Sequence, residues 1–205
     1  MELHEALARV SEIRQQLARS ATFRGYRAAP AAFSGFLAIA AAIVQHLWLI
    51  DPAGQLTRYL SIWIGVAIVS LAVTASEMAV RHLRRDSAMG REMLRMAAGQ
   101  FCPCLLAGAL VTVVVVRFAP TQAWMLPGLW SILYGLGIFA SRPLLPPAIF
   151  FMAGFYLLAG LMCLALAQGE HAFSPWAMGA SFGPGQLIGA MVLYWNLERR
   201  DEPES

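Results

Sequence analysis

Two cysteines flank a proline inside an apolar stretch of the chain, at a spacing that could bind a soft metal ion. The segment is Cys102-Pro103-Cys104, and thiolate ligands favour Cu(I) or zinc. The same residues are also explained as two small apolar side chains beside a proline at the start of a helix. A metal site at Cys102 and Cys104 is therefore one of two interpretations.

A glycine-rich stretch around Gln186 could bind a small polar solute. Gly183, Pro184 and Gly185 precede the glutamine. Small residues let helices approach closely, and a proline within a helix removes a backbone donor and can kink the helix. Gln186 could then hydrogen-bond across a helix bundle or contact a solute. Tyr134 lies in a second stretch of this kind, so the same two interpretations, packing and solute binding, apply to it.

The other polar residues in apolar stretches form no catalytic motif. Glu77 has Arg81 one helical turn away, which indicates a salt bridge at a helix end, and His46 stands alone. The sequence holds no phosphate-binding loop, nucleophile elbow or paired acidic motif. We expect a protein without enzymatic activity and without a cofactor; an intramembrane enzyme that uses backbone and polar groups is the alternative.

The elements that carry these residues are predicted to be membrane-spanning helices. The chain is 59% hydrophobic and 13% charged, whereas a soluble domain carries about 25% charged residues. A helix of about 20 apolar residues crosses a bilayer core about 30 Å thick. Six stretches qualify, namely Ala31–Ile50, Tyr59–Val80, Ala98–Phe118, Ala123–Ala140, Pro147–Ala167 and Pro175–Leu197. The sequence thus predicts an all-α membrane protein with six transmembrane helices in contact with lipid.

The arginines of the chain predict its orientation. Thirteen fall on one side of the six predicted spans, and only Arg58 and Arg117 fall on the other. Cytoplasmic loops carry the excess of positive charge, so we expect a bacterial inner-membrane protein with both termini in the cytoplasm. No basic stripe with interleaved aromatic residues occurs, which argues against direct binding of nucleic acid.

Residues 1–29 are predicted to form a cytoplasmic amphipathic helix before the first span. Apolar residues recur there at spacings typical of one helix face: Leu3, Leu7, Val10, Ile13 and Leu17. This face could lie on the membrane, or residues 1–23 could dock a cytoplasmic protein. The helical bundle fills residues 30–197, and residues 198–205 form a charged cytoplasmic tail. The arginine-rich loop Arg81–Met96 also has helical character and is expected to extend the two neighbouring spans.

The third and sixth predicted spans share a sequence pattern. Phe101–Val111 and Phe182–Val192 match at six of eleven positions, at a constant offset of 81 residues. Each copy falls on the third helix of a three-helix half, and the two halves would run in opposite directions because three is odd. Inverted repeats of this kind are typical of many transporters. Chance similarity between two apolar helices is the alternative.

Three further places in the chain carry a resemblance to a protein family. They are Glu12-Ile13-Arg14 with Ser20-Ala21-Thr22-Phe23, Leu126-Pro127-Gly128-Leu129-Trp130 with Tyr134-Gly135-Leu136-Gly137, and Met178-Gly179-Ala180-Ser181-Phe182-Gly183. Together they resemble a group of uncharacterised bacterial six-span membrane proteins, whose genes often lie beside a small winged-helix DNA-binding protein. Members often have histidine at the position of Gln186. The resemblance implies six spans and brings no activity with it.

These observations favour a non-enzymatic membrane protein that binds a partner and has a regulatory role. A small-solute transporter or channel is the first alternative. Soft-metal binding at Cys102 and Cys104 is the second.

Overall fold

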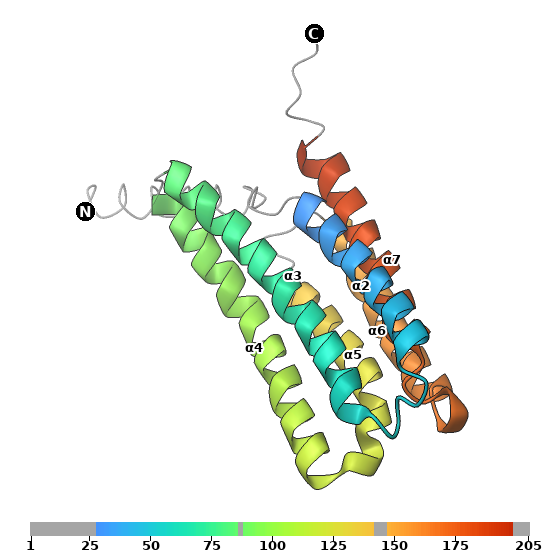
Figure 1. Ribbon diagram of the computed structural model, residues 1–205. Coiled ribbons are helices and arrows are strands. Elements are labelled where there is room, and N and C mark those ends of the chain that lie inside the picture. Colours follow the sequence, from blue (N-terminus) through green and yellow to red (C-terminus); the bar gives the residue numbers. More distant parts are fainter. Residues whose placement is uncertain (1–27, 86–87, 142–146, 199–205) are drawn as a thin grey trace, which may run out of the picture.

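The protein is built from long helices. The computed structural model describes residues 28–85, 88–141 and 147–198, and within these ranges it contains no strand. Six long helices follow one another along the chain: α2 (Ala28–Trp48), α3 (Leu56–Arg85), α4 (Ala88–Phe118), α5 (Leu126–Ala140), α6 (Ile149–Leu166) and α7 (Pro175–Leu193). They run alternately up and down, so that α2 begins and α7 ends at the same end of the molecule (Figure 1).

Among the described residues, five segments are long and apolar enough to cross a membrane. They are Ala28–Trp48, Leu56–Val80, Ala98–Phe118, Pro120–Ala140 and Ile149–Leu166. The predicted class, an all-α protein with several membrane-spanning helices, is confirmed to that extent. The sixth predicted segment also forms a helix, α7, which continues as a π-helical turn over Tyr194–Glu198. α7 carries no charged side chain, but its glycines, Pro184 and Gln186 make it less apolar than the other five.

Proline and glycine mark the helix boundaries at the end of the molecule where α2 ends and α7 begins, which is the lower end in Figure 1. A 3-10 helix, η1 (Pro120–Met125), begins with a proline and leads directly into α5. Pro175 occupies the first turn of α7, where its missing N–H would have had no helical partner. Between α6 and α7 lies the short 3-10 helix η3 (Gly169–His171), in which Gly169 has a φ of +58°. Glycine adopts this left-handed conformation without steric cost.

Helices α3 and α4 are longer than a membrane requires. They contain 30 and 31 residues, whereas about 20 suffice to cross the bilayer core. α3 continues from Val80 to Arg85, and α4 begins ten residues before Ala98. The expectation that the loop Arg81–Met96 extends the neighbouring spans as helix is confirmed for the described backbone.

Two pairs of antiparallel helices pack closely through glycines. In α2 and α7, a Cβ atom added to Gly35 would lie 3.0 Å from the carbonyl oxygen of Gly183. In α5 and α6, a Cβ atom added to Gly160 would lie 2.7 Å from the carbonyl oxygen of Gly128. Such contacts, with backbone against backbone, are typical of membrane helices, whose association relies on close van der Waals packing.

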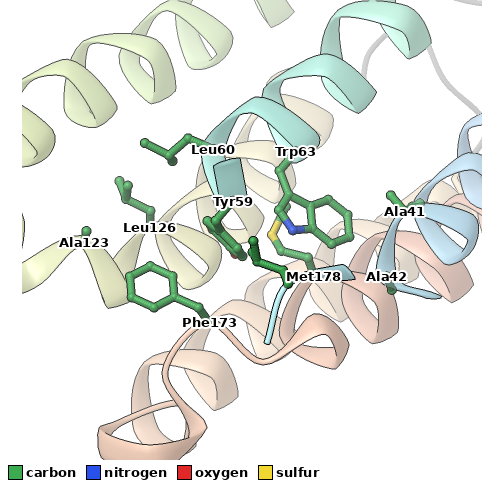
Figure 2. Packing of buried hydrophobic residues seen from close by; sticks show 11 residues of the cluster. Ala41, Ala42, Tyr59, Leu60, Trp63, Ala123, Leu126, Phe173 and Met178 are labelled. Carbon is green, nitrogen blue, oxygen red and sulfur yellow. The ribbon is translucent and has the colours of Figure 1, made fainter. Parts of the chain in front are cut away.

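The interior contains two clusters of buried side chains, one toward each end of the helices. The lower cluster includes Tyr59, Trp63, Leu126, Phe173 and Met178, and Figure 2 shows their side chains directed toward one another. The upper cluster consists of buried residues from α5, α6 and α7: Ile138, Ile149, Met152, Ala153, Tyr156 and Leu193. The buried hydrogen bonds of Gln45 lie within the lower cluster, and the hydrogen bond between Gln186 and Tyr134 lies beside the upper one.

Beyond Trp63, helices α3 and α4 have few buried residues. Between Ile64 and Val80 no residue of α3 is buried, and between Ala98 and Phe118 only Thr112 is buried. By contrast, eight residues of the Pro120–Ala140 segment are buried. The described structure therefore consists of a close-packed group, α2, α5, α6 and α7, with two long helices along one side (Figure 1).

Candidate functional site

Tyr134 and Gln186, two residues singled out from the sequence, meet in the interior of the helix bundle. Tyr134 lies on α5 and Gln186 on α7, and the side-chain amide of Gln186 donates a hydrogen bond of 2.6 Å to the tyrosine hydroxyl. Both side chains are only partly exposed. Neither group is charged, so the pair offers hydrogen-bond donors and acceptors without the cost of a buried charge.

Aromatic rings enclose the Tyr134 end of this hydrogen bond. The ring of Tyr134 lies edge-on to those of Phe101, Tyr156 and Phe182, with centroid distances of 5.3, 4.8 and 5.5 Å. Edge-to-face packing at these distances is favourable for aromatic pairs. Three helices, α4, α6 and α7, therefore fix the position of one side chain on α5.

Tyr156 brings a further polar atom to the same cluster. Its side chain is fully buried, and its hydroxyl has no hydrogen-bond partner among the described residues. It lies against Gly185, where an added Cβ would be 2.6 Å from the phenol oxygen. Sequence reasoning missed Tyr156, because a tyrosine in an apolar helix gives no signal that separates a buried hydroxyl from one at the membrane surface.

The five predicted solute-site residues do not all face this cluster. Tyr134, Gln186 and Gly185 belong to it. Gly183 faces α2, where an added Cβ would lie 2.7 Å from the Cγ1 atom of Ile39. Pro184 is exposed. The structure thus brings three of the five residues together and assigns Gly183 to helix packing.

The two copies of the sequence pattern converge on Tyr134. Phe101 and Phe182 hold the same position in the pattern, 81 residues apart, and both contact the ring of Tyr134. The two halves differ in packing, however, since α6 packs against α7 whereas α3 and α4 make hardly any contact in the described residues. The inverted repeat stays a prediction.

A second polar cluster lies toward the lower end of the bundle. Gln45 is fully buried; its amide donates to the carbonyl oxygen of Phe173 at 2.7 Å, and its own oxygen accepts from the indole N–H of Trp63 at 2.7 Å. Phe173 has a φ of +60°, an unusual conformation for a residue with a side chain. Tyr59 packs edge-on against Phe173, and its buried hydroxyl has no partner.

Sequence reasoning noticed His46 and passed over its neighbour Gln45. His46 is exposed, whereas Gln45 joins three segments of the bundle. The available signal was the amide itself, because a buried polar side chain near the end of an apolar helix requires a hydrogen-bond partner. The network holds the loop before α7 against α2 and α3.

The two cysteines of the predicted metal site lie on different faces of α4. Cys102 is exposed, and Cys104 is half-buried against α5, where an added Cβ on Gly137 would lie 3.2 Å from its Cβ. Residues two apart on a helix do not face each other. Among the described residues no group of three metal-binding side chains occurs. A metal ion shared by both thiols would therefore require α4 to open at Pro103.

The predicted docking residues, Leu3, Leu7, Val10, Ile13 and Leu17, lie outside the described residues. The same holds for the tail after residue 198. No protein-family model, curated protein or solved structure matches the chain. The resemblance to a bacterial six-span family accordingly stays a prediction.

Proposed function

We propose that the protein is a six-span inner-membrane protein that binds a cytoplasmic partner and carries out no catalysis. The observation that carries this proposal is the helical extension of α3 and α4 beyond their apolar segments. The extended segments contain five of the chain's arginines and lie at the end of the molecule where α2 begins and α7 ends (Figure 1). Residues 1–23, which are predicted to dock the partner, precede α2 in the sequence.

The packing of α7 supports a sixth span. α7 runs antiparallel beside α2, which is itself a candidate span, with Gly179 beside Ala42 and Gly183 beside Ile39. Its 19 residues extend about 28 Å at about 1.5 Å per residue, close to the thickness of the bilayer core. A helix that lies along a membrane-spanning neighbour for this length crosses the same layer.

The distribution of arginine supports the proposed orientation. The end of α3 and the start of α4 contain Arg81, Arg84, Arg85, Arg91 and Arg95. They lie at the same end of the molecule as the start of α2 (Figure 1). Arg58 and Arg117 lie at their opposite ends. Positive charge accumulates on the cytoplasmic side of bacterial membrane proteins. This rule supports a cytoplasmic position for the extended ends of α3 and α4.

Site-specific photocrosslinking in living cells tests whether a cytoplasmic partner binds. A crosslinking residue at position 88 or 92 reports on the extension, and one at position 121 or 170 is the matched control at the opposite end. We expect a discrete adduct with a cytoplasmic protein from positions 88 and 92 only, and its loss when residues 1–23 are deleted or Arg84, Arg85 and Arg91 become glutamine. Adducts with lipid alone, or none at all, would refute partner binding.

A small-solute transporter is a second candidate function, and one observation favours it. The hydrogen bond between Gln186 and Tyr134 lies beside the unpartnered hydroxyl of Tyr156, which gives the bundle interior polar groups that a solute could bind. A transporter should retain its flux when residues 1–23 are deleted and lose it in Gln186→Leu. If the protein instead binds a partner, deletion of residues 1–23 should abolish partner binding and Gln186→Leu should leave it intact.

A further inference from the structure

A groove lies where α2 ends and α3 begins. It is lined by Trp48, Leu49, Thr57, Arg58, Ser61 and Ile62, and its volume is about 400 Å³. This volume falls in the range of about 300–1,000 Å³ that is typical of small-molecule sites. Apolar side chains and one cationic group line the same groove, so it is suited to an amphipathic ligand.

The depth of the groove corresponds to the headgroup layer of a membrane. The apolar segment of α2 ends at Trp48, and that of α3 begins at Leu56. Trp48 is 79% exposed, and Ile50, just beyond it, is 95% exposed. Tryptophan side chains favour the boundary between hydrocarbon and headgroups. The molecule nearest to this groove in a membrane is therefore a lipid.

Arg58 gives the groove its charge. One N–H of the Arg58 guanidinium donates to the side-chain oxygen of Gln55 at 2.7 Å, which holds the group at the rim and leaves its other donors available. The nearby Asp51 carboxylate is turned toward its own loop, where it accepts a hydrogen bond of 3.0 Å from the backbone N–H of Gly54. Guanidinium groups bind phosphate oxygens with strong, charge-assisted hydrogen bonds.

We propose that this groove binds an anionic phospholipid. The phosphate lies against Arg58, with the exposed hydroxyl of Thr57 as a further donor, and one acyl chain runs along Trp48 and Ile62. The site is separate from the extended ends of α3 and α4, and it does not depend on the proposed partner. Arg117 supplies a matched control, because it is also an exposed arginine at the lower end of the molecule but does not line the groove.

Native mass spectrometry of the full chain, delipidated and titrated with phosphatidylglycerol or phosphatidylcholine, tests the proposal. We expect one phosphatidylglycerol to bind in preference to phosphatidylcholine. Arg58→Gln should weaken this binding about tenfold, whereas Arg117→Gln should leave it unchanged and Arg58→Lys should restore most of it. Trp48→Ala, which removes one wall of the groove, is a second variant and should weaken binding even where Arg58→Gln proves unstable.

Several results of this experiment would overturn the proposal, each for a different reason. Equal binding of the two lipids, or equal effects of Arg58→Gln and Arg117→Gln, would show only general attraction to charge and would overturn the proposal. Displacement of the lipid by millimolar inorganic phosphate would assign the site to a free anion instead, which also overturns it. Retained preference in both Arg58→Gln and Trp48→Ala would place the lipid elsewhere on the protein.

Discussion

Gln186 and Tyr134, 52 residues apart, are joined by a hydrogen bond of 2.6 Å between α7 and α5. If this bond stabilises helix packing, Tyr134→Phe and Gln186→Leu should show a coupling free energy of about 1 kcal/mol, since hydrogen bonds between membrane helices are of this order. Reversible unfolding of the two single variants and the double variant in bicelles measures the coupling. Strictly additive effects would contradict a direct interaction.

The variant Tyr156→Phe distinguishes between a packing role and a solute-binding role of the same cluster. Its buried hydroxyl has no partner, and removal of an unpartnered buried polar group removes its desolvation cost. We therefore expect the free energy of unfolding to stay equal or to rise by about 1 kcal/mol. A decrease of that size would show that the hydroxyl is bonded in the membrane, to water or to a solute.

Gln45 is expected to be the polar residue on which the lower end of the bundle most depends. Gln45→Leu leaves the Trp63 N–H and the Phe173 carbonyl oxygen buried without partners, at a cost of about 1–3 kcal/mol for each group. The unfolding free energy and the tryptophan emission should both change. Gln168→Leu is the control, because Gln168 is exposed and its side-chain amide donates to the nearby carbonyl oxygen of Leu164, near the end of α6; it should behave as the unmodified protein.

Two glycines of α6 test the close approach between helices. A Cβ on Gly160 would lie 2.6 Å from Ile132 and 2.7 Å from the carbonyl oxygen of Gly128, whereas one on Gly154 would meet nothing within 4 Å. Gly160→Ala should destabilise the protein by about 1–3 kcal/mol through overpacking. Gly154→Ala should be neutral or slightly stabilising. Equal effects of the two substitutions would contradict the close packing of α5 and α6.

Fusions to a topology reporter test directly whether α7 crosses the membrane. Reporters fused after residue 53 and after residue 170 should lie in the periplasm, and one fused after residue 198 should lie in the cytoplasm. A reporter active only in the periplasm should be active at the first two positions and silent at the third. Activity after residue 198 would mean that α7 does not cross, and it would leave five spans.

The metal hypothesis makes its own prediction. If Cys102 and Cys104 hold Cu(I), the protein purified from copper-supplemented cells should contain one ion per chain, and Cys102→Ser with Cys104→Ser should contain none. Cys163→Ser serves as the control, because Cys163 lies on α6 and donates to the carbonyl oxygen of Ala177. Metal analysis that finds no copper in the unmodified protein would end this hypothesis.

Hydropathy predicted the helices well, because apolar runs of this length have few other structures available in a membrane. The helical extension of α3 and α4 was predicted from the spacing of residues in Arg81–Met96. The candidate residues Tyr134 and Gln186 were also found from the sequence, since polar groups in apolar helices need partners. Their pairing was not, because it depends on how closely α5 and α7 approach.

The lower cluster shows a second limit of sequence reasoning. The left-handed backbone of Phe173 has no signal in a phenylalanine, which rarely adopts that conformation. Its carbonyl oxygen accepts a hydrogen bond from Gln45 because the loop before α7 lies against Gln45 of α2 and Tyr59 of α3. Long-range contacts of this kind follow from tertiary packing and not from local spacing.

The pairing of α2 with α7 also bears on how the protein is made. Ribosomes release a chain from its N-terminus at about 5–20 residues per second, so α2 enters the membrane well before α7 is synthesised. The face of α2 that includes Gly35 and Ala42 packs closely against Gly179 and Gly183 of α7. During synthesis this face must be covered by lipid or by the insertion machinery, and loss of α7 from a truncated chain would expose it to quality-control proteases.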